Sequence, residues 1–236
     1  MIRGLHFSAS GMMAQMTGQE VIANNLANAN TNGYKRESVG FAGVLSDASK
    51  AAPTATLAPR TAFDFASGPL QPTDSPLSLA LEGDGFFSID TPNGPAYTRD
   101  GAFRIDAEGY LATSAGNRVL GESGPIRLSS RGDVSVNASG VVVQGGSEAG
   151  RLRIAQFGSS DSMQRIGDNL WMASENGKPA TETRVRQGFI EGSNVNSIHE
   201  MVAMIAGLRA YEANQKVVQA QDETLDKLVN DVGRAG

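Results

Sequence analysis

Proline divides this chain into three zones. All nine prolines of the 236 residues lie between residues 34 and 192, and both ends are free of proline. Because proline breaks the interior of a helix, long helices are restricted to the two ends. The middle holds most of the 28 glycines, the residue that tight turns between strands require. This distribution predicts a mainly β central domain with long N- and C-terminal α-helices.

The first 33 residues carry a heptad-like apolar pattern. Its positions recur at alternating intervals of three and four residues, and only Gln19 interrupts the apolar series. The pattern stops in the stretch from Asn24 to Gly33, because Asn and Gly tolerate the left-handed conformation that ends helices. The N-terminal helix should be weak alone and need a partner. Its expected seam is Ile2, Leu5, Ala9, Met12, Met16, Gln19, Ala23 and Leu26.

The C-terminal zone carries the stronger helix pattern. Ser197 and Glu200 fit a capping box at its start, and Gly233 fits its end. Two long helices flanking a β domain predict a coiled-coil-like inner layer of an α+β protein. The alternative is that both helices fold onto the β domain as ordinary core. The stripe of this helix, polar at Gln215, is Ile198, Met201, Ile205, Leu208, Tyr211, Gln215, Val218, Leu225, Val229 and Val232.

Short apolar runs fill the middle of the chain. Turn signals such as Glu82–Gly85 and Asp106–Gly109 separate them, which is typical of a meandering all-β domain. The expected strands are Leu79–Leu81, Phe86–Asp90, Ala96–Arg99, Phe103–Ile105, Tyr110–Thr113, Arg118–Leu120, Ile126–Leu128, Val134–Val136, Val141–Gln144, Arg151–Phe157, Leu170–Met172 and Val185–Glu191.

Residues 36–76 differ from the rest of the middle. They are rich in Ala, Thr, Ser and Pro with little periodicity, which predicts an extended connector that gains order from its neighbours. The expected domains are therefore a discontinuous terminal-helix domain, this connector and a β domain. Their ranges are 1–35 with 193–236, then 36–76, and 77–192.

Composition excludes several kinds of chemistry. The chain has no cysteine and only two histidines, His6 and His199, so thiol catalysis and a three-histidine metal site within one chain are impossible. The net charge of −5 argues against binding to nucleic acid. Gly83-Asp84-Gly85 opens a strand rather than a helix, so it is a turn and not a nucleotide fingerprint. We expect no enzyme, no catalytic residues, no cofactor and no metal.

The sequence shows neither a membrane-spanning segment nor a cleavable secretory signal. No segment reaches the ~20 apolar residues of a membrane span, so we expect no direct membrane insertion. Polar residues interrupt any cleavable secretory signal near the start. The chain is therefore either cytosolic or exported by a route that reads no cleaved signal.

Five asparagines lie between residues 24 and 32, where a helix interior would disfavour them. Two explanations remain open. The stretch is a frayed helix end leading into a turn, or its side-chain amides bridge neighbouring subunits, as a buried Asn does when it fixes the register of a helical seam.

Four ordered segments of this chain closely resemble the bacterial flagellar rod and hook protein family. They cover both ends and the middle. These segments are Val21–Arg36, Pro76–Phe87, Tyr97–Phe103 with Gly109–Leu111, and Gly192–Asn196 with parts of the helix up to Val218.

The resemblance implies a structural subunit of the flagellar basal-body rod. Such a subunit polymerises helically through its terminal helices into the periplasmic drive shaft that transmits torque to the hook. The implied partners are copies of itself, neighbouring axial rod proteins and the flagellar type III export apparatus, which reads no cleaved signal. The short chain and its ending Asp222–Lys227 favour the proximal rod over the distal rod or a short hook-type subunit.

The rival from another class is a glycan- or surface-binding β module with helical anchors. It would need exposed aromatic side chains, and the chain has one Trp, four Tyr and nine Phe, many of them in core-like positions. An enzyme is the third candidate. For the rod subunit, the expected subunit-assembly residues are Leu5, Met12, Met16, Asn24, Asn25, Leu26, Asn28, Asn30, Val202, Ile205, Leu208, Tyr211, Val218 and Leu225.

Overall fold

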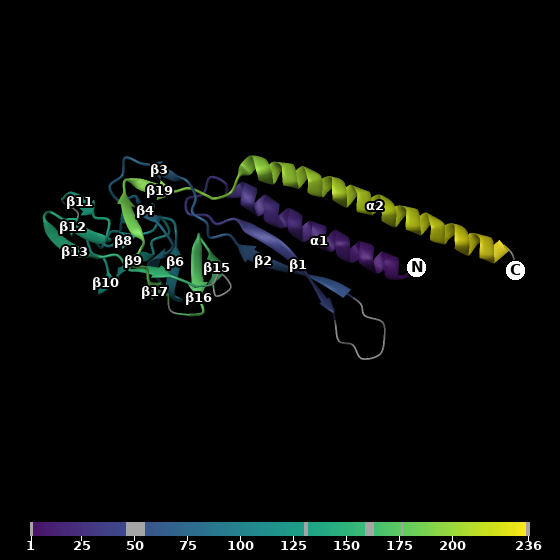
Figure 1. Ribbon diagram of the computed structural model, residues 1–236, viewed down its shortest axis with the longest axis horizontal. Helices are drawn as coiled ribbons and strands as arrows, with labels where there is room; N and C mark the ends of the chain where they lie inside the picture. The colour runs from purple at the N-terminus through teal and green to yellow at the C-terminus, as the bar shows by residue number, and fades with distance from the viewer. Residues whose placement is uncertain (1, 46–54, 130–131, 159–162, 176, 235–236) are drawn as a thin grey trace. The chain divides into compact units, whose positions relative to one another are not determined.

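Long helices stand at both ends of the chain and strands lie between them (Figure 1). This computed structural model describes residues 2–45, 55–129, 132–158, 163–175 and 177–234. The chain divides into two compact units. The helical unit is Met1–Ala27, Glu37–Ala62 and Asn196–Gly236, and the β unit is Asn28–Arg36 and Phe63–Val195. The expected combination of a β-rich domain with terminal helices is confirmed.

The helical unit is built on two antiparallel helices, α1 (Ile2–Ala27) and α2 (Ser197–Arg234). They lie side by side in Figure 1. The Gln19 side-chain amide donates a hydrogen bond of 3.0 Å to the Met204 carbonyl, and that of Gln15 donates one of 3.4 Å to Gly207. The polar interruption of the N-terminal seam is therefore a bridge between the two helices.

A two-stranded ribbon completes this unit. β1 (Glu37–Leu45) pairs with β2 (Ala55–Phe63), and β1 packs against α1. Both strands fall in the stretch expected to be an extended connector of little regular structure. Gly, Ala and Thr residues interrupt the apolar residues of both strands, so the pairing left only a weak periodic signal in the sequence.

The start of α2 differs by one residue from the expected capping box. The Asn196 side-chain oxygen accepts the His199 amide at 3.1 Å, and the Asn196 carbonyl accepts the Glu200 amide at 3.0 Å. Asn196 is thus the N-cap in place of Ser197. Asn and Ser cap helices about equally well, so residue type alone did not separate the two positions.

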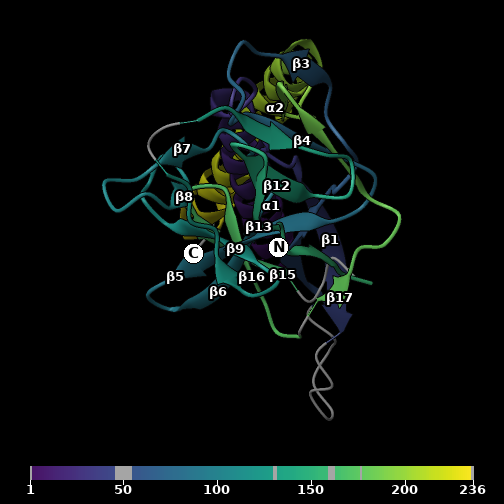
Figure 2. The ribbon, with the colours of Figure 1, turned by 90° about the vertical axis from the view of Figure 1, so that its left-hand side faces the viewer.

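The β unit contains a branched ten-stranded sheet with the main order β15-β16-β6-β5-β9-β8-β7. Figure 2 shows β5, β6 and β16 running next to one another. Small sheets β11-β12-β13, β18-β4 and β19-β3 surround it. The larger strands are β4 (Leu79–Glu82), β5 (Phe86–Thr91), β6 (Gly94–Thr98), β9 (Arg118–Gly121), β12 (Val141–Gln144), β13 (Ser147–Arg151), β15 (Met163–Gly167), β16 (Leu170–Ala173) and β18 (Arg184–Gln187).

The remaining strands are short. They are β3 (Leu70–Pro72), β7 (Arg104–Ile105), β8 (Leu111–Ala112), β10 (Gly124–Pro125), β11 (Val134–Val136), β14 (Ile154–Gln156), β17 (Lys178–Pro179) and β19 (Phe189–Glu191).

Two of the strands expected from the sequence differ in the structure. Ile126–Leu128 is not a strand, although Ile126 and Leu128 are buried, because only Arg127 forms a bridge there. The expected run Val185–Glu191 is two strands, β18 and β19, separated by Gly188 with φ of 78°. The positive φ turns the chain and sends the two strands to different partners. Apolar content predicted burial correctly but could not predict backbone pairing.

The β unit has two apolar clusters, and β5 supplies both. Phe87 and Ile89 belong to the larger cluster, whereas Phe86 belongs to an aromatic cluster with Tyr97 and Trp171. Successive side chains of a strand point to opposite faces, so β5 is covered on both sides. This explains why β5 lies in the interior of the sheet.

Candidate assembly site

The first three turns of α2 expose a row of large apolar side chains. Ile198 is 72% exposed, Val202 62% and Ile205 54%. Met201 and Leu208 lie on the same row and are about half exposed. Their spacing of three and four residues puts them on one helix face. A contiguous apolar face of this kind marks an interaction surface.

α1 adds exposed methionines to the helical unit. Met13 is 70% exposed and Met16 is 52% exposed. A shallow hollow between the two helices is lined by Met16, Gln19, Glu20, Leu208 and Tyr211. The exposed surface of the helical unit thus offers both an apolar row and a recess next to it.

Among the described residues, every buried apolar side chain belongs to the β unit. Of the helical unit's described side chains, the fully buried ones are the polar Asn25 and Glu200. Burial of apolar surface is the main stabilising contribution to a fold. The helical unit is therefore short of a core of its own, and a partner on its apolar face would supply one.

The predicted assembly residues fall into three groups. Met16, Val202, Ile205 and Leu208 are exposed. Met12, Leu26, Tyr211 and Val218 are half-buried. The side chains of Leu5 and Leu225 lie outside the described part of the chain.

The asparagines among the predicted residues have different surroundings. The Asn25 side chain is fully buried, donates to the Glu37 carbonyl at 2.8 Å and accepts the Glu37 amide at 2.9 Å. It is therefore used within its own chain, joining the end of α1 to the start of β1. The Asn28 side-chain oxygen accepts the Thr31 hydroxyl at 3.2 Å in the turn that follows. Asn24 and Asn30 are exposed, and their bridging of subunits stays a prediction.

A buried ionic cluster in the β unit was not foreseen. One carboxylate oxygen of Glu191 accepts the Lys35 ammonium at 2.6 Å and the Gly68 amide at 2.9 Å. The other oxygen accepts the Arg99 guanidinium at 3.1 Å. The side chains of Lys35, Glu191 and Arg99 are at most 2% exposed. Hydrogen bonds between charged groups are the stronger ones, so this carboxylate is firmly held.

Backbone carbonyls satisfy the two cations further. Lys35 donates to the Ala66 carbonyl at 2.7 Å, and Arg99 donates to the Gly83 carbonyl at 2.6 Å. Burial lowers the pKa of Lys35 below its usual value of 10.5, although the Glu191 carboxylate acts in the opposite direction. Two cations against one carboxylate are costly to bury, and these carbonyl contacts offset part of that cost.

Asn194 ties the same segments together through their backbone. Its side-chain oxygen accepts the Arg36 amide at 2.7 Å. Its amide group donates to the carbonyls of Asp64 at 2.8 Å and Ala66 at 3.1 Å. We refer to Lys35, Arg99, Glu191 and Asn194, with the backbone they hold at residues 36, 64, 66 and 68, as the clasp.

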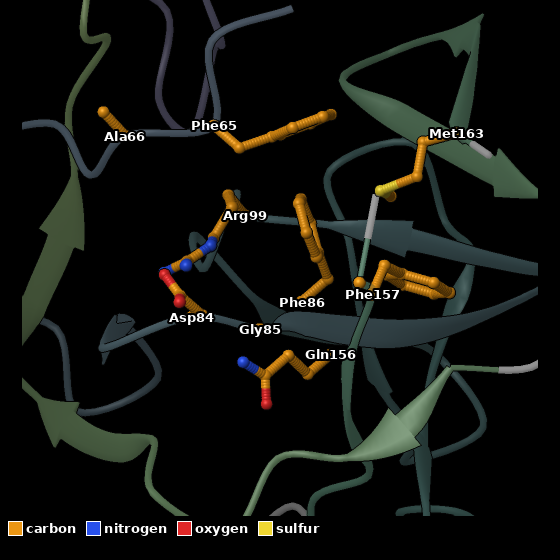
Figure 3. A pocket seen from close by; sticks show the side chains of 10 residues that line it. Phe65, Ala66, Asp84, Gly85, Phe86, Arg99, Gln156, Phe157 and Met163 are labelled. Atoms are coloured by element: carbon orange, nitrogen blue, oxygen red, sulfur yellow. The ribbon is translucent and has the colours of Figure 1, made fainter. Parts of the chain in front are cut away.

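Aromatic packing holds one of these segments from another side. The Phe63 and Phe65 rings make edge contacts with Trp171, with centroids 4.6 and 5.1 Å apart. Phe65 also contacts Phe86, and the Arg99 guanidinium lies over the Phe86 ring at 5.4 Å. Figure 3 shows Arg99, Phe65 and Phe86 lining a small open hollow. The residues after β2 are thus fixed by both rings and charges.

Gly33 makes the approach of the first segment possible. It has φ of 67°, and a side chain there would overlap the backbone of Arg99 and Asp100. The Gly33 amide donates to the Glu191 carbonyl at 2.8 Å. Only glycine fits this conformation at this distance, so the turn after the asparagines serves the clasp directly.

Sequence reasoning missed the clasp because its members are far apart along the chain. The Lys35–Glu191 bond joins positions separated by 156 residues. The one local signal is Glu191, a charged residue directly after the apolar pair Phe189-Ile190 in an expected strand. Charged residues are seldom fully buried unless paired, so the default expectation was a solvated side chain.

Within the described ranges, His, Asp and Glu side chains form no group of three suited to a metal ion. The helices in those ranges also lack the length and apolar character needed to cross a membrane. The turn acids Asp106 and Glu108, one of the expected turn clusters, form ion pairs with Arg118.

A β-rich body carrying long terminal helices with an exposed apolar face is the arrangement of a subunit built for a larger assembly. Comparisons with known families agree. Residues 5–35 match the family described as flagella basal body rod protein, residues 80–144 the flagellar hook protein FlgE/F/G D1 domain, and residues 186–231 the flagellar basal body rod FlgEFG protein C-terminal.

Curated relatives cover almost the whole chain. The Bacillus subtilis flagellar basal-body rod protein FlgG is 34% identical, with 98% of this chain and 99% of the relative covered. The FlgG protein of Borreliella burgdorferi is 36% identical, with coverage of 95% and 97%. The FlgF protein of Rhizobium meliloti is 35% identical, with 98% of both chains covered. This chain belongs to the flagellar basal-body rod protein family, whose members are structural subunits and not enzymes.

Proposed function

We propose that this protein polymerises helically, through α1 and α2, into the flagellar rod that spans the periplasm and transmits torque to the hook. The observation that carries the proposal is the exposed apolar row from Ile198 to Leu208, on a unit whose described residues include no fully buried apolar side chain. A contact between different surfaces of identical subunits that does not close on itself generates a helical filament. The terminal helices would then form a coiled-coil-like inner layer.

We assign a separate role to each of the three expected domains. Residues 1–35 with 193–236 assemble the rod, residues 36–76 connect, and residues 77–192 form the β domain. The proposed partners are copies of this chain, neighbouring axial proteins of the basal body and the flagellar type III export apparatus, with export that needs no cleaved signal. Family membership supports this part of the proposal.

Chain length supports a subunit of the FlgF type. The alignment with the Rhizobium meliloti FlgF extends over 238 residues, against 265 for the Bacillus subtilis FlgG, with 98% of this chain covered in both. Since this chain has 236 residues, the longer alignment contains more positions without a counterpart here. The near-equal lengths favour the FlgF type, and placement in the proximal rod remains part of this proposal.

The test places a charge on the apolar row. Leu208 is 51% exposed, so Leu208→Asp should leave the β unit folded but abolish motility and rod assembly, because a carboxylate would be buried in each subunit contact. Ala213→Asp adds the same charge at an exposed position farther along α2 and is the matched control. Basal bodies isolated from each strain and imaged by electron microscopy give the readout, with Trp171 fluorescence as the folding check.

Leu26→Asp provides a second site on α1, where the side chain is half-buried. Rods of normal length and normal swimming in both leucine variants would overturn the proposal. A wild-type chain that stays outside isolated basal bodies and binds glycans instead would favour the β-module alternative.

A further inference from the structure

The chain passes between its two units at four places. The β unit takes part in these crossings through residues 28–36, residues from 63 onward, and residues up to 195. Any force that travels along the backbone from the terminal helices or the ribbon into the β unit must therefore enter through these three segments.

The clasp fastens all three segments to one another. Glu191 binds Lys35 of the first segment and the Gly68 amide of the second. Asn194 binds the Arg36 amide of the first and the Asp64 carbonyl of the second. Both residues belong to the third segment, so no segment is held by its own neighbours alone.

Arg99 connects this fastening to the sheet. It follows β6 directly, and its guanidinium donates to the Glu191 carboxylate and to the Leu81 and Gly83 carbonyls. Leu81 belongs to β4, which pairs with β18 along four residues. The three entering segments are thereby attached to two sheets of the β unit through a single side chain.

The charged hydrogen bonds of the clasp resist displacement of the three segments relative to one another better than apolar packing would. Apolar contacts are non-directional and change little when surfaces shift, whereas charged hydrogen bonds fix both distance and direction. Because Glu191 is the anion that Lys35 and Arg99 share, its removal would leave both buried cations without their ion-pair partner and loosen the three segments together. Such behaviour suits a joint under load more than it serves stability, since buried ion pairs contribute little net stability.

We propose that the clasp is the joint through which this subunit transmits torque, locking the three crossing segments into one body with the β sheets. The inference rests on the proposed function as a rod subunit. It predicts that weakening the clasp lets the three segments move together while the β core stays intact, and that the defect grows with mechanical load.

Hydrogen exchange on the full-length chain tests the coupling. In Glu191→Gln, amides at residues 33–36 and 64–68 should exchange about a hundredfold faster, together with those at 191–195, because two buried cations have lost their anion. The native fluorescence of Trp171 should stay unchanged, and the amides of β5 and β6 should remain the slowest to exchange. Glu82→Gln breaks an exposed pair with Arg186, 2.9 Å long, and is the matched control. Faster exchange confined to residues 191–195, or amides of β5 and β6 that exchange as fast as the three segments, would overturn the proposal.

Measuring motility under mechanical load tests whether the clasp transmits torque. Cells in which the variant replaces the native subunit should form rods in normal number yet lose rotation speed more steeply than wild type as the medium becomes more viscous. A viscosity dependence equal to wild type would refute the joint. If Glu191→Gln does not fold, Lys35→Met, which keeps Arg99 beside Glu191, takes its place in both measurements. Failure of the wild-type chain to enter rods would instead refute the proposed function, so the two failures are distinguishable.

Discussion

At the scale of single residues, this protein buries three charged side chains where its three crossing segments meet. Lys35, Arg99 and Glu191 are each at most 2% exposed, and burial lowers the pKa of both cations. Neighbouring carbonyls and one carboxylate compensate them. In such a cluster, removing the shared anion should lower the free energy of unfolding far more than removing one of the two cations.

Glu191→Gln should lower the free energy of unfolding of the β unit by about 3–5 kcal/mol, since two buried cations lose their anion. Lys35→Met should cost less, because Arg99 stays paired with Glu191. Urea denaturation followed by the fluorescence of Trp171, the chain's one tryptophan, measures both. Arg186→Met breaks an exposed pair and should cost about 0–1 kcal/mol. Equal costs for the buried and exposed pairs would contradict this account.

Asp100 should make stability depend on pH in the acid range. Burial raises its pKa above the usual 3.8, so the folded state holds the proton more tightly than the unfolded state. Between those two pKa values the contribution of Asp100 to stability falls as pH rises, and the cost is fully present at neutral pH. In the wild-type chain, the Asp100 carboxylate accepts the Ala102 amide at 3.0 Å. Asp100→Asn keeps an oxygen that can accept this hydrogen bond and removes the charge.

The stability of Asp100→Asn relative to wild type should therefore be greatest near pH 7 and shrink as pH falls toward about 4. Paired thermal melts across this range provide the measurement. A difference that is constant with pH would show that Asp100 titrates normally in the folded chain.

At the scale of elements, the sequence pattern located the helices and most strands but not their polar contacts. α1 ends at Ala27, inside the asparagine-rich stretch, and β12 has the expected bounds Val141–Gln144. β15 was missed because Met163–Gly167 lacks clear alternation. Gln19 looked like a defect in an apolar seam, since a pattern along one helix cannot show that a carbonyl of another helix faces it.

Gly207 tests that helix contact. A side chain at position 207 would overlap the Gln19 amide nitrogen, whereas space is open at Gly18. Gly18→Ala should stabilise the helical unit by about 1 kcal/mol through helix propensity. Gly207→Ala should gain nothing net, because displacing Gln19 from the Met204 carbonyl costs about 1 kcal/mol. Thermal melts followed by far-UV circular dichroism compare them, and equal gains would show that Gln19 contributes nothing.

At the scale of the whole molecule, the apolar row of α2 could be predicted from the sequence and the clasp could not. Residues such as Ile205 and Leu208 follow from helix periodicity, which needs only neighbouring sequence. The clasp depends on residues 35, 99 and 191 meeting in space, and no local pattern encodes that meeting. The two units also differ: among the described residues, the β unit holds all the buried apolar side chains, and the helical unit has only half-buried and exposed ones.

Two units with such different cores should unfold separately. In the unassembled chain, far-UV circular dichroism, which reports mainly on α1 and α2, should melt at a lower temperature than Trp171 fluorescence, which reports on the β unit. The reason is that all described buried apolar side chains lie in the β unit. Assembly into rods should raise the helical transition toward or above the other, because binding stabilises the folded state.

Val202→Glu supplies the control for that shift. Val202 is 62% exposed, so the variant should leave both transitions of the unassembled chain in place while removing the increase on assembly. A single coincident transition in the unassembled wild-type chain would show instead that the helices draw their stability from the β unit. The need for a partner on the apolar row of α2 would then lose its physical basis.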